Sequence, residues 1–363
     1  MQVFSILLDS DSNAYFGNTI VNSCVILRSN KEIKVRSIAV SIRGKAEASW
    51  VQNRGKRHDK YQTFLLYIKE DFTLWKCPDT SNKLPPGEYQ FPFQFFIPHD
   101  APPNIYSDYG NIRYWIDANL DIPWGFDKSV KLEFSVCPFV DLNAESRFAI
   151  PVMKHVQTTS NPLKNVTIKI PKMGYVYGES IPLYVEIGSN LISSITYVEM
   201  GIQRIWEFTA ECLEPYIFTP TEPMTKIASK KYPLHRISSF PIEKNYSVTL
   251  FHSLCLPPLP PSYDYCGFIK VYYSVFVKLH TKAKFSSGPT VCLPIVIGTI
   301  PLKEMLTEVG PCVIGDDDYI HPPIPTSITS EFNFENVQFW EEKSLTDSEA
   351  DDIYVWQPKS VFS

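Results

Sequence analysis

One stretch of the chain, residues 84–120, limits the possible fold more than any other. Apolar side chains recur at every second position of residues 91–97 and again of residues 112–118, a period typical of strands with one buried face. Residues 98–103 lie between these runs and contain three prolines, which cannot donate hydrogen bonds to a sheet. The stretch therefore predicts two long strands joined by a rigid corner.

A similar arrangement returns in the second half, where two apolar runs again flank a proline-rich segment, residues 257–261. Matching residues of the two halves are separated by a nearly constant number of positions, from 161 for Gly17 and Gly178 to 157 for Ile112 and Ile269. A constant offset indicates an internal repeat, and a few loop deletions account for the drift. We therefore predict two copies of one fold.

The composition favours strands and rigid turns, because aromatic residues make up 14% of the 363 residues and 30 prolines stand against 15 glycines. The predicted fold class is all-β, with two tandem sandwiches of the immunoglobulin type. A polar segment, residues 209–243, predicts a long, poorly ordered connection with short strands. The expected boundaries are residues 1–138 for the first sandwich, 139–162 for a linker, 163–302 for the second sandwich and 303–363 for a flexible, disordered acidic tail.

Charge is unevenly distributed along the chain. Eleven acidic and two basic residues follow position 310, so the segment after this position has a net charge of −9. The whole chain has a net charge of −5, so residues 1–310, the body of the protein, have a net charge of +4. A mildly basic body can approach anionic membrane surfaces or phosphorylated partners, and an ordinary solvated surface is the alternative. We expect peripheral proximity to membranes and no nucleic-acid partner.

The eight cysteines and seven histidines are scattered, without clusters at the spacing of metal ligands. We interpret the cysteines as reduced thiols of a cytosolic protein. The start of the chain lacks the basic leader of a signal peptide, and the apolar runs are too short to span a bilayer. No nucleophile elbow, phosphate-binding loop or paired-histidine motif occurs, so we predict a protein that is not an enzyme and binds no cofactor or metal.

Five segments resemble, in colinear order, the arrestin-domain-containing proteins, or α-arrestins. They are SIRGKAEASW at residues 41–50, the stretch 84–123, IPKMGYVYGESIP at 170–182, LPPLPPS at 256–262 and IVIGTIPL at 295–302. The resemblance covers residues 1–302 and implies an N-terminal and a C-terminal arrestin domain. It also implies a cytoplasmic, non-catalytic adaptor that recognises membrane cargo and brings in ubiquitin ligases or the endocytic machinery.

From this resemblance we expect an adaptor in protein transport, which binds the cytoplasmic tails of membrane proteins and promotes their endocytosis, sorting or ubiquitination. Such a protein would act in the cytoplasm, at the periphery of the plasma membrane or of endosomes. The alternative is a structural scaffold of a vesicle or endosomal coat, similar to the arrestin-fold subunits of retromer, without ligase recruitment.

A basic segment, VQNRGKRHDK at residues 51–60, corresponds by position to the loop that arrestins extend toward their cargo. Its candidate cargo-binding residues are Arg54, Lys56, Arg57 and Lys60, which can form charge-assisted hydrogen bonds with phosphorylated or acidic tails. A solvated hairpin tip is the other interpretation. Both interpretations predict an exposed segment.

Many α-arrestins bind the WW domains of ubiquitin ligases through the motif PPxY. This chain has such a motif in Pro260, Pro261 and Tyr263, but it coincides with the predicted corner of the second sandwich, so we interpret it as structural. In the tail, residues 321–327, HPPIPTS, have threonine where the motif needs tyrosine. Recruitment of WW-domain ligases is therefore left open.

The tail also contains candidate phosphorylation sites, Ser344, Thr346 and Ser348, each followed by acidic residues as acid-directed kinases prefer. Phosphorylation would add about −1.5 to −2 charges per site to a segment that is already acidic. Disorder without regulation is the alternative interpretation.

Overall fold

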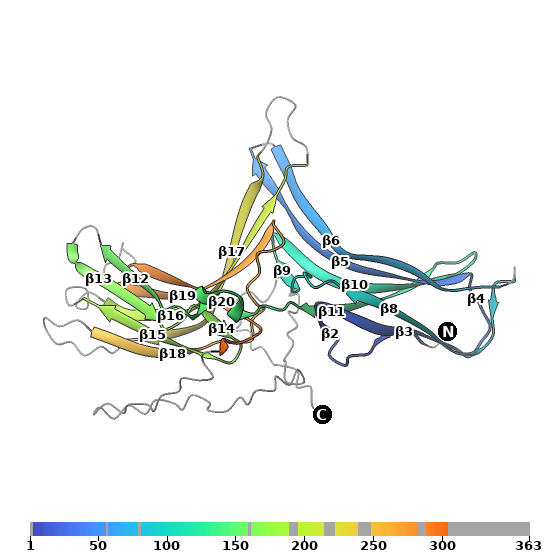
Figure 1. Ribbon diagram of the computed structural model, residues 1–363. Coiled ribbons are helices and arrows are strands. Elements are labelled where there is room, and N and C mark those ends of the chain that lie inside the picture. The colour runs from blue at the N-terminus through green and yellow to red at the C-terminus, as the bar shows by residue number, and fades with distance from the viewer. Residues whose placement is uncertain are drawn as a thin grey trace.

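The computed structural model describes residues 3–55, 57–78, 81–158, 161–188, 195–213, 222–238, 248–281 and 288–303. These residues form two elongated β-sandwiches that lie end to end, with two long hairpins rising together from the junction (Figure 1). The predicted all-β fold with two tandem sandwiches is confirmed. Of the tail predicted for residues 303–363, only Lys303 lies within the described residues.

Alternating apolar residues build the N-terminal sandwich. Its strands are β1 (Val3–Leu8), β2 (Ala14–Phe16), β3 (Thr19–Ser29), β4 (Ile33–Lys34), β5 (Ser37–Arg54), β6 (Arg57–Lys76), β7 (Lys83–Leu84), β8 (Gly87–Ile97), β9 (Ile105–Ser107), β10 (Gly110–Asp121) and β11 (Lys128–Cys137). One sheet has the order β1-β3-β8, and the other has the order β2-β11-β10-β5-β6 with β9 paired to β10. Phe134 on β11 joins the two layers, because its ring centroid lies 5.4 Å from that of Phe95 on β8.

The C-terminal sandwich repeats this architecture. Its strands are β12 (Val152–Thr158), β13 (Asn161–Ile170), β14 (Gly174–Val176), β15 (Ser180–Ile187), β16 (Ile195–Ala210), β17 (Met224–Ile237), β18 (Val248–Cys255), β19 (Ile269–Thr281) and β20 (Thr290–Gly298). One sheet has the order β12-β13-β15-β18 and the other the order β14-β20-β19-β16-β17. Each sandwich contains a parallel pair, β2 with β11 and β14 with β20, at corresponding places. The repeat predicted from the sequence offset is therefore a repeat of topology.

The central strands establish which residues of the two halves correspond. Tyr114 lies opposite Gly44 where β10 pairs with β5, and Tyr273 lies opposite Arg204 where β19 pairs with β16. The offset between these residues is 159 to 160 positions, so the predicted offset of 157 for β10 and β19 is wrong by two positions. When two strand sequences are aligned two positions out of register, the same face of each strand still points inward. The apolar pattern alone therefore cannot detect such an error.

The segment between the sandwiches also differs from the prediction. The proposed linker, residues 139–162, contains two 3-10 helices, η1 (Leu142–Ala144) and η2 (Ser146–Ala149), and the whole of β12. This strand is an edge strand of the C-terminal sandwich, and two of its side chains, Val152 and Val156, pack against the core. The segment predicted as the linker therefore contains regular structure.

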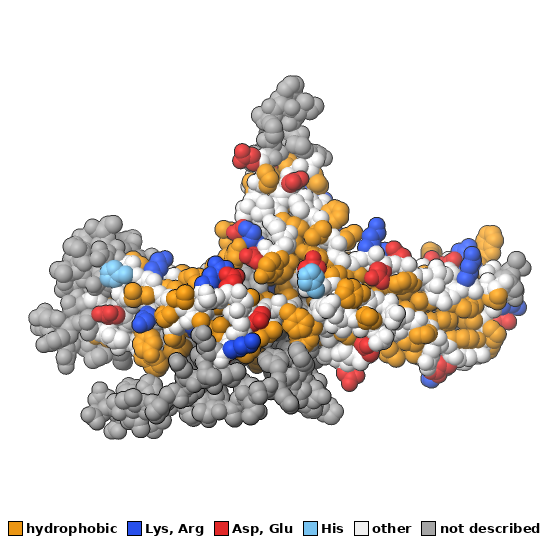
Figure 2. Space-filling view, in the orientation of Figure 1, with side chains coloured by type: hydrophobic (Ala, Val, Ile, Leu, Met, Phe, Trp, Pro, Cys, Tyr) orange, Lys and Arg blue, Asp and Glu red, His pale blue; other side chains and the backbone are white. Residues whose placement is uncertain are grey.

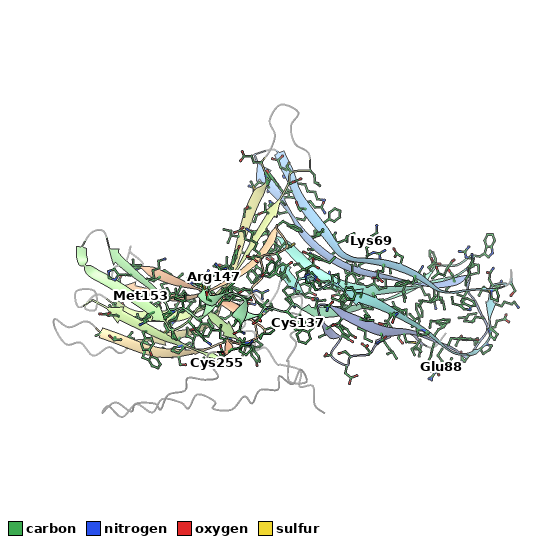
Figure 3. The ribbon with its side chains drawn as sticks, in the orientation of Figure 1. Lys69, Glu88, Cys137, Arg147, Met153 and Cys255 are labelled. Carbon is green, nitrogen blue, oxygen red and sulfur yellow. The ribbon has the colours of Figure 1, made fainter. Side chains whose placement is uncertain are left out.

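Buried apolar side chains form one connected core through both sandwiches, from Ile6 on β1 to Ile297 on β20. Side chains fill the junction between the domains, where Cys137 ends β11 (Figure 3). Burial raises the pKa of the Cys137 thiol to about 12, which keeps this sulfur protonated at neutral pH. The two domains thus meet through packed apolar surface.

Candidate functional site at the paired hairpins

The two hairpins at the junction, β5–β6 and β16–β17, lie side by side (Figure 1). The first hairpin keeps its ladder to the end, where Arg54 pairs with Arg57. Gly55 follows Arg54 with a φ of +66°, a left-handed conformation that glycine adopts without strain. Residues 51–55 and 57–60 therefore form the paired ends of a hairpin.

Backbone hydrogen bonds join the two hairpins along the edge of β6. Gln62 N donates to Glu211 O, and Leu213 N donates to Lys60 O, each at 2.9 Å. Glu211 directly follows β16, so the chain after this strand continues the sheet beside β6. We call the described residues within 45–66 and 206–230 the crest.

An aromatic cluster fixes the base of the crest. The rings of Trp50 and Tyr61 stack with centroids 5.9 Å apart, and Tyr109 meets the edge of Trp50 at 6.2 Å. Tyr109 also lies 6.4 Å from the ring of Phe208 on β16, which belongs to the other domain. Pairs of this geometry add stabilisation beyond buried area, so the two hairpins are held in a defined relation.

The outer surface of the crest has exposed apolar side chains next to a cation. Val51 and Phe64 are each 58% exposed, Leu213 is 50% exposed, and Ile227 on β17 is 66% exposed. The Nζ of Lys45 lies 5.2 Å from the ring centroid of Phe64, within the range of a cation–π interaction. Hydrophobic side chains accordingly continue along the visible face of the crest (Figure 2). Exposed apolar side chains of this size are found at many binding surfaces.

The crest carries charges of both signs. The Glu47 carboxylate lies 2.7 Å from Lys45 Nζ and also accepts a hydrogen bond from Gln62. Burial raises the pKa of Glu47, but the hydrogen bonds from Lys45 and Gln62 outweigh burial, and the net effect lowers this pKa. Glu47 is therefore ionised at neutral pH. Lys226 on β17 donates to Gln52 Oε1 at 2.7 Å, which adds a polar contact between the hairpins.

The structure describes only part of the basic set predicted at the tip. Lys60 is exposed on β6, where its carbonyl accepts the hydrogen bond from the second hairpin. The backbones of Arg54 and Arg57 end and begin their strands, but their side chains, and the whole of Lys56, lie outside the described residues. Sequence reasoning missed the contribution of the second hairpin, because nothing in the local pattern of residues 211–230 indicates its partner.

The PPxY-like segment lies in a folded corner. Pro260 and Pro261 are buried, Tyr263 is 3% exposed, and the carbonyl of Pro260 accepts a hydrogen bond from the Tyr273 hydroxyl at 2.7 Å. Tyr263 also exchanges two backbone hydrogen bonds with Val271 on β19, at 3.1 and 2.6 Å. The prolines and the tyrosine thus face the core and the sheet in this conformation.

Tyr263 also connects the two domains. Its hydroxyl lies 3.3 Å from that of Tyr67 on β6, a residue of the N-terminal sandwich. Burial, with hydrogen bonds to Cys266 and Tyr263, raises the pKa of Tyr67 far above its usual value of 10.0. Both phenols are therefore neutral donors and acceptors under any physiological condition.

Comparison with known proteins gives the family of this fold. Residues 4–143 match the family described as "Arrestin (or S-antigen), N-terminal domain", and residues 161–302 match "Arrestin (or S-antigen), C-terminal domain". The chain belongs to the arrestin-domain-containing proteins. Members of this family are generally adaptors without enzymatic activity, and an adaptor role in this general sense applies here.

Three relatives illustrate the extent of the similarity. "Arrestin domain-containing protein 17" of Caenorhabditis elegans is 26% identical over 323 residues, which cover 84% of this chain and 72% of the relative. "Arrestin domain-containing protein 4" of Homo sapiens is 27% identical over 309 residues, with coverages of 81% and 70%. "Thioredoxin-interacting protein" of Homo sapiens is 22% identical over 306 residues, with coverages of 82% and 74%.

The remaining predictions for this arrestin-domain protein fall mostly outside the described residues. Ser344, Thr346 and Ser348 all lie beyond position 303, as does the HPPIPTS segment. Within the described ranges, no group of three His, Cys, Asp or Glu residues has the geometry to hold a metal ion. The same ranges contain no helix long and apolar enough to cross a bilayer.

Proposed function

We propose that this arrestin-domain protein is an adaptor in protein transport, which binds cytoplasmic tails of membrane-protein cargo with its crest and promotes their endocytosis, sorting or ubiquitination. The observation that supports this proposal is the exposure of large apolar side chains on both hairpins, Phe64 on β6, Leu213 beside it and Ile227 on β17. Large apolar side chains that project from a hairpin can serve as anchors for a partner. The proposed site of action is the cytoplasmic face of the plasma membrane or of endosomes.

The chemistry of the crest favours a tail with apolar and acidic or phosphorylated side chains. Apolar groups of the cargo tail would cover Phe64 on the first hairpin or Ile227 on the second, both of which are exposed. Phosphate or carboxylate groups would meet the basic residues of the hairpin tip, Arg54, Lys56, Arg57 and Lys60, through charge-assisted hydrogen bonds. We therefore propose that phosphorylation of the cargo tail strengthens its binding to the crest.

We assign Pro260, Pro261 and Tyr263 a structural role. A WW domain binds an extended polyproline II segment, and it needs both the prolines and the tyrosine side chain. In the folded chain Tyr263 is buried and its backbone is paired with Val271. Contact with WW-domain ligases or with endocytic coat proteins would thus use other segments of the chain.

Affinity capture of the full chain tests this proposal. Tagged protein is incubated with detergent-solubilised membranes, and the recovered proteins are identified. The wild type is compared with the crest variant Phe64→Ser/Ile227→Ser and with a matched control, Leu7→Ser/Met153→Ser. The control removes exposed apolar groups far from the crest. We expect integral membrane proteins with the wild type and the control, and about fivefold less with the crest variant. Recovery of coat subunits alone would favour a scaffold, and equal recovery by all three proteins would remove the crest as the site.

A further inference from the structure

The loop between β10 and β11, residues 122–127, presents two aromatic side chains fully to solvent. Trp124 is 102% exposed and Phe126 is 97% exposed, the highest values among the large hydrophobic residues that the structure describes. The next in this group, Tyr265, is 78% exposed. Two aromatic side chains that are almost fully exposed and only two positions apart add little to the core, so they need an explanation outside the fold itself.

The conformation of this loop is defined by its hydrogen bonds. Gly125 N donates to Ile122 O at 3.3 Å, which closes a β-turn with Pro123 and Trp124 at its centre. The Asp127 carboxylate accepts from Ile122 N at 3.0 Å, so the two ends of the loop are tied together. The loop therefore projects as a short, closed tip.

Trp124 takes a backbone conformation that is unusual for its type. Its φ is +61°, and it occupies the third position of a turn whose second position is Pro123. This position of a type II turn normally holds glycine or asparagine, because bulky residues are strained there. Strain of this kind is kept in proteins mainly where it serves a function. Here it directs an indole ring away from the protein.

Exposed lysines surround the tip at the end of the N-terminal sandwich that is remote from the junction. In Figure 1 this end carries β4, and in Figure 2 hydrophobic and basic side chains lie next to one another there. The pairing of β10 with β11 and β5, and of β5 with β6, places Lys128 and Lys76 at the strand ends beside the loop, and Lys31 and Lys34 lie a few residues before β5; all four are exposed. Asp121 and Glu32 of this end pair with cations, Asp121 with Arg36 at 2.6 Å and Glu32 with Lys83 at 2.9 Å. Asp127 in the loop is exposed and accepts the hydrogen bond from Ile122 N.

We propose that the tip formed by Trp124 and Phe126, with the surrounding lysines, is an insertion site for an anionic lipid bilayer. Tryptophan and phenylalanine enter the interfacial layer of membranes, where the indole N–H can still reach polar head groups. Lysines near the surface attract anionic lipids. A convex tip favours a deformable lipid surface over a preformed protein groove. This inference goes beyond the proposed function, because it requires no cargo tail.

Vesicle flotation with the full chain tests the site. Protein-free vesicles of phosphatidylcholine, with and without phosphatidylserine, are used with the wild type, with Trp124→Ser/Phe126→Ser and with the control Leu7→Ser/Met153→Ser. We expect wild type and control to float with phosphatidylserine vesicles, and at least about tenfold weaker binding for the tip variant and for vesicles without the anionic lipid. Thermal unfolding of the variants checks that these exposed substitutions leave the fold intact.

A second measurement locates the contact. Lipids brominated in their acyl chains quench tryptophans that enter the bilayer, so they should quench the wild type, and the Trp124→Phe variant should still float but lose this quenching. Lys34→Glu/Lys128→Glu should float less with anionic vesicles. The proposal is overturned when the wild type does not float, or when the tip variant floats as well as the wild type. It is also overturned when the tip mediates dimerisation instead, that is, when the wild type is a dimer and Trp124→Ser/Phe126→Ser is a monomer. Binding of cargo tails by the tip variant would remain normal in each case, which separates this test from that of the crest.

Discussion

In the N-terminal sandwich the Tyr114 hydroxyl donates to the carbonyl of Pro102 at 2.8 Å, and in the C-terminal sandwich the Tyr273 hydroxyl donates to that of Pro260 at 2.7 Å. Each corner is also bonded to the last strand of its sandwich, where Val136 N donates to a side-chain oxygen of the first corner. In the second corner the corresponding acceptor is a serine hydroxyl, which receives a bond from a backbone N–H of β20. The two corners are thus the same structural element.

One difference between the corners concerns the residue that pairs with the central strand. Ile105 of the first corner pairs with β10 and is fully buried, and Tyr263 holds the equivalent place beside β19. Tyr263 extends further and reaches Tyr67 of the other domain. A tyrosine at this position therefore creates a contact between domains, and with the corner prolines it also creates the sequence of a WW ligand. The packing of the corner alone is consistent with this sequence.

The largest effect is expected from truncation at this position. Tyr263→Ala removes a buried ring and should lower the free energy of unfolding by about 3–5 kcal/mol, and Ile105→Ala should lower it by about 2–5 kcal/mol. Urea denaturation of the full chain measures both changes. A change below about 0.5 kcal/mol for Tyr263→Ala would mean that the side chain is dispensable for the fold.

A second difference concerns the residue opposite the corner tyrosine. Gly44 faces Tyr114, and a Cβ added there would lie 2.6 Å from the ring, whereas the equivalent residue of the second sandwich is Arg204. Gly44→Ala should therefore destabilise the chain by about 1–3 kcal/mol through overpacking. The double variant Gly44→Ala/Tyr114→Leu should recover part of this loss. Without such recovery, the ring of Tyr114 would not be the cause.

Removing the corner hydroxyls tests whether the two corners are energetically equal. Tyr114→Phe and Tyr273→Phe each leave a buried proline carbonyl without its donor, and each should cost about 1–2 kcal/mol. Differential scanning calorimetry of the two variants gives the comparison. A loss confined to one variant would show that the corners share geometry but not energetics.

A smaller effect is expected at the contact between domains. Tyr67→Phe removes one hydroxyl from the pair with Tyr263 and should reduce stability by about 0.5–1 kcal/mol. The variant should also increase amide hydrogen exchange in β6 and in the second corner together. Exchange that rises in β6 alone would argue against coupling of the domains through these phenols.

The smallest effects concern ion pairs at equivalent places of β5 and β16. The folded-state pKa of Glu47 lies below its usual 4.5, so its contribution to stability is present above that pH and is lost as the pH falls through the folded value. The pKa of Lys270, which is hydrogen-bonded to Glu207, is raised above 10.5, so its contribution is lost as the pH rises through the raised value. Glu47→Gln should thus lower the free energy of unfolding by up to about 0.5 kcal/mol at neutral pH and leave it unchanged in acid. Lys270→Gln should likewise lower the free energy of unfolding at neutral pH and leave it unchanged in strong alkali. The reverse pattern in pH-dependent thermal unfolding would contradict this assignment.

Much of the fold could be predicted from the sequence, because its central strands alternate strictly. Residues of β10 alternate between buried and half-buried along the whole strand, and the apolar residues of the sequence recur with the same period of two. The segment that contains β17 was predicted to be a poorly ordered connection, because it is polar. In the structure β17 is an edge strand, and Lys226, Lys230 and Lys231 lie on its largely solvated segment. Edge strands have only one partner and a weak apolar pattern, so periodicity does not detect them.

The candidate sites were less predictable than the fold. The basic tip at residues 51–60 was recognised as exposed, but its union with residues 211–213 depends on a contact between domains. The contact of Tyr67 with Tyr263 joins residues 196 positions apart, and no local pattern encodes it. The repeat did predict that Pro260 and Pro261 form a corner, because the first copy has prolines at the same place.

The central claim, that residues 260–263 are a structural corner, is tested most directly by a titration with a WW domain. Isothermal titration calorimetry compares the intact chain with a synthetic peptide of residues 257–266. We predict binding to the free peptide and none to the intact, folded chain, because the folded corner buries Tyr263. Binding of the intact chain with the affinity of the peptide, lost in a folded Tyr263→Phe variant, would contradict the claim.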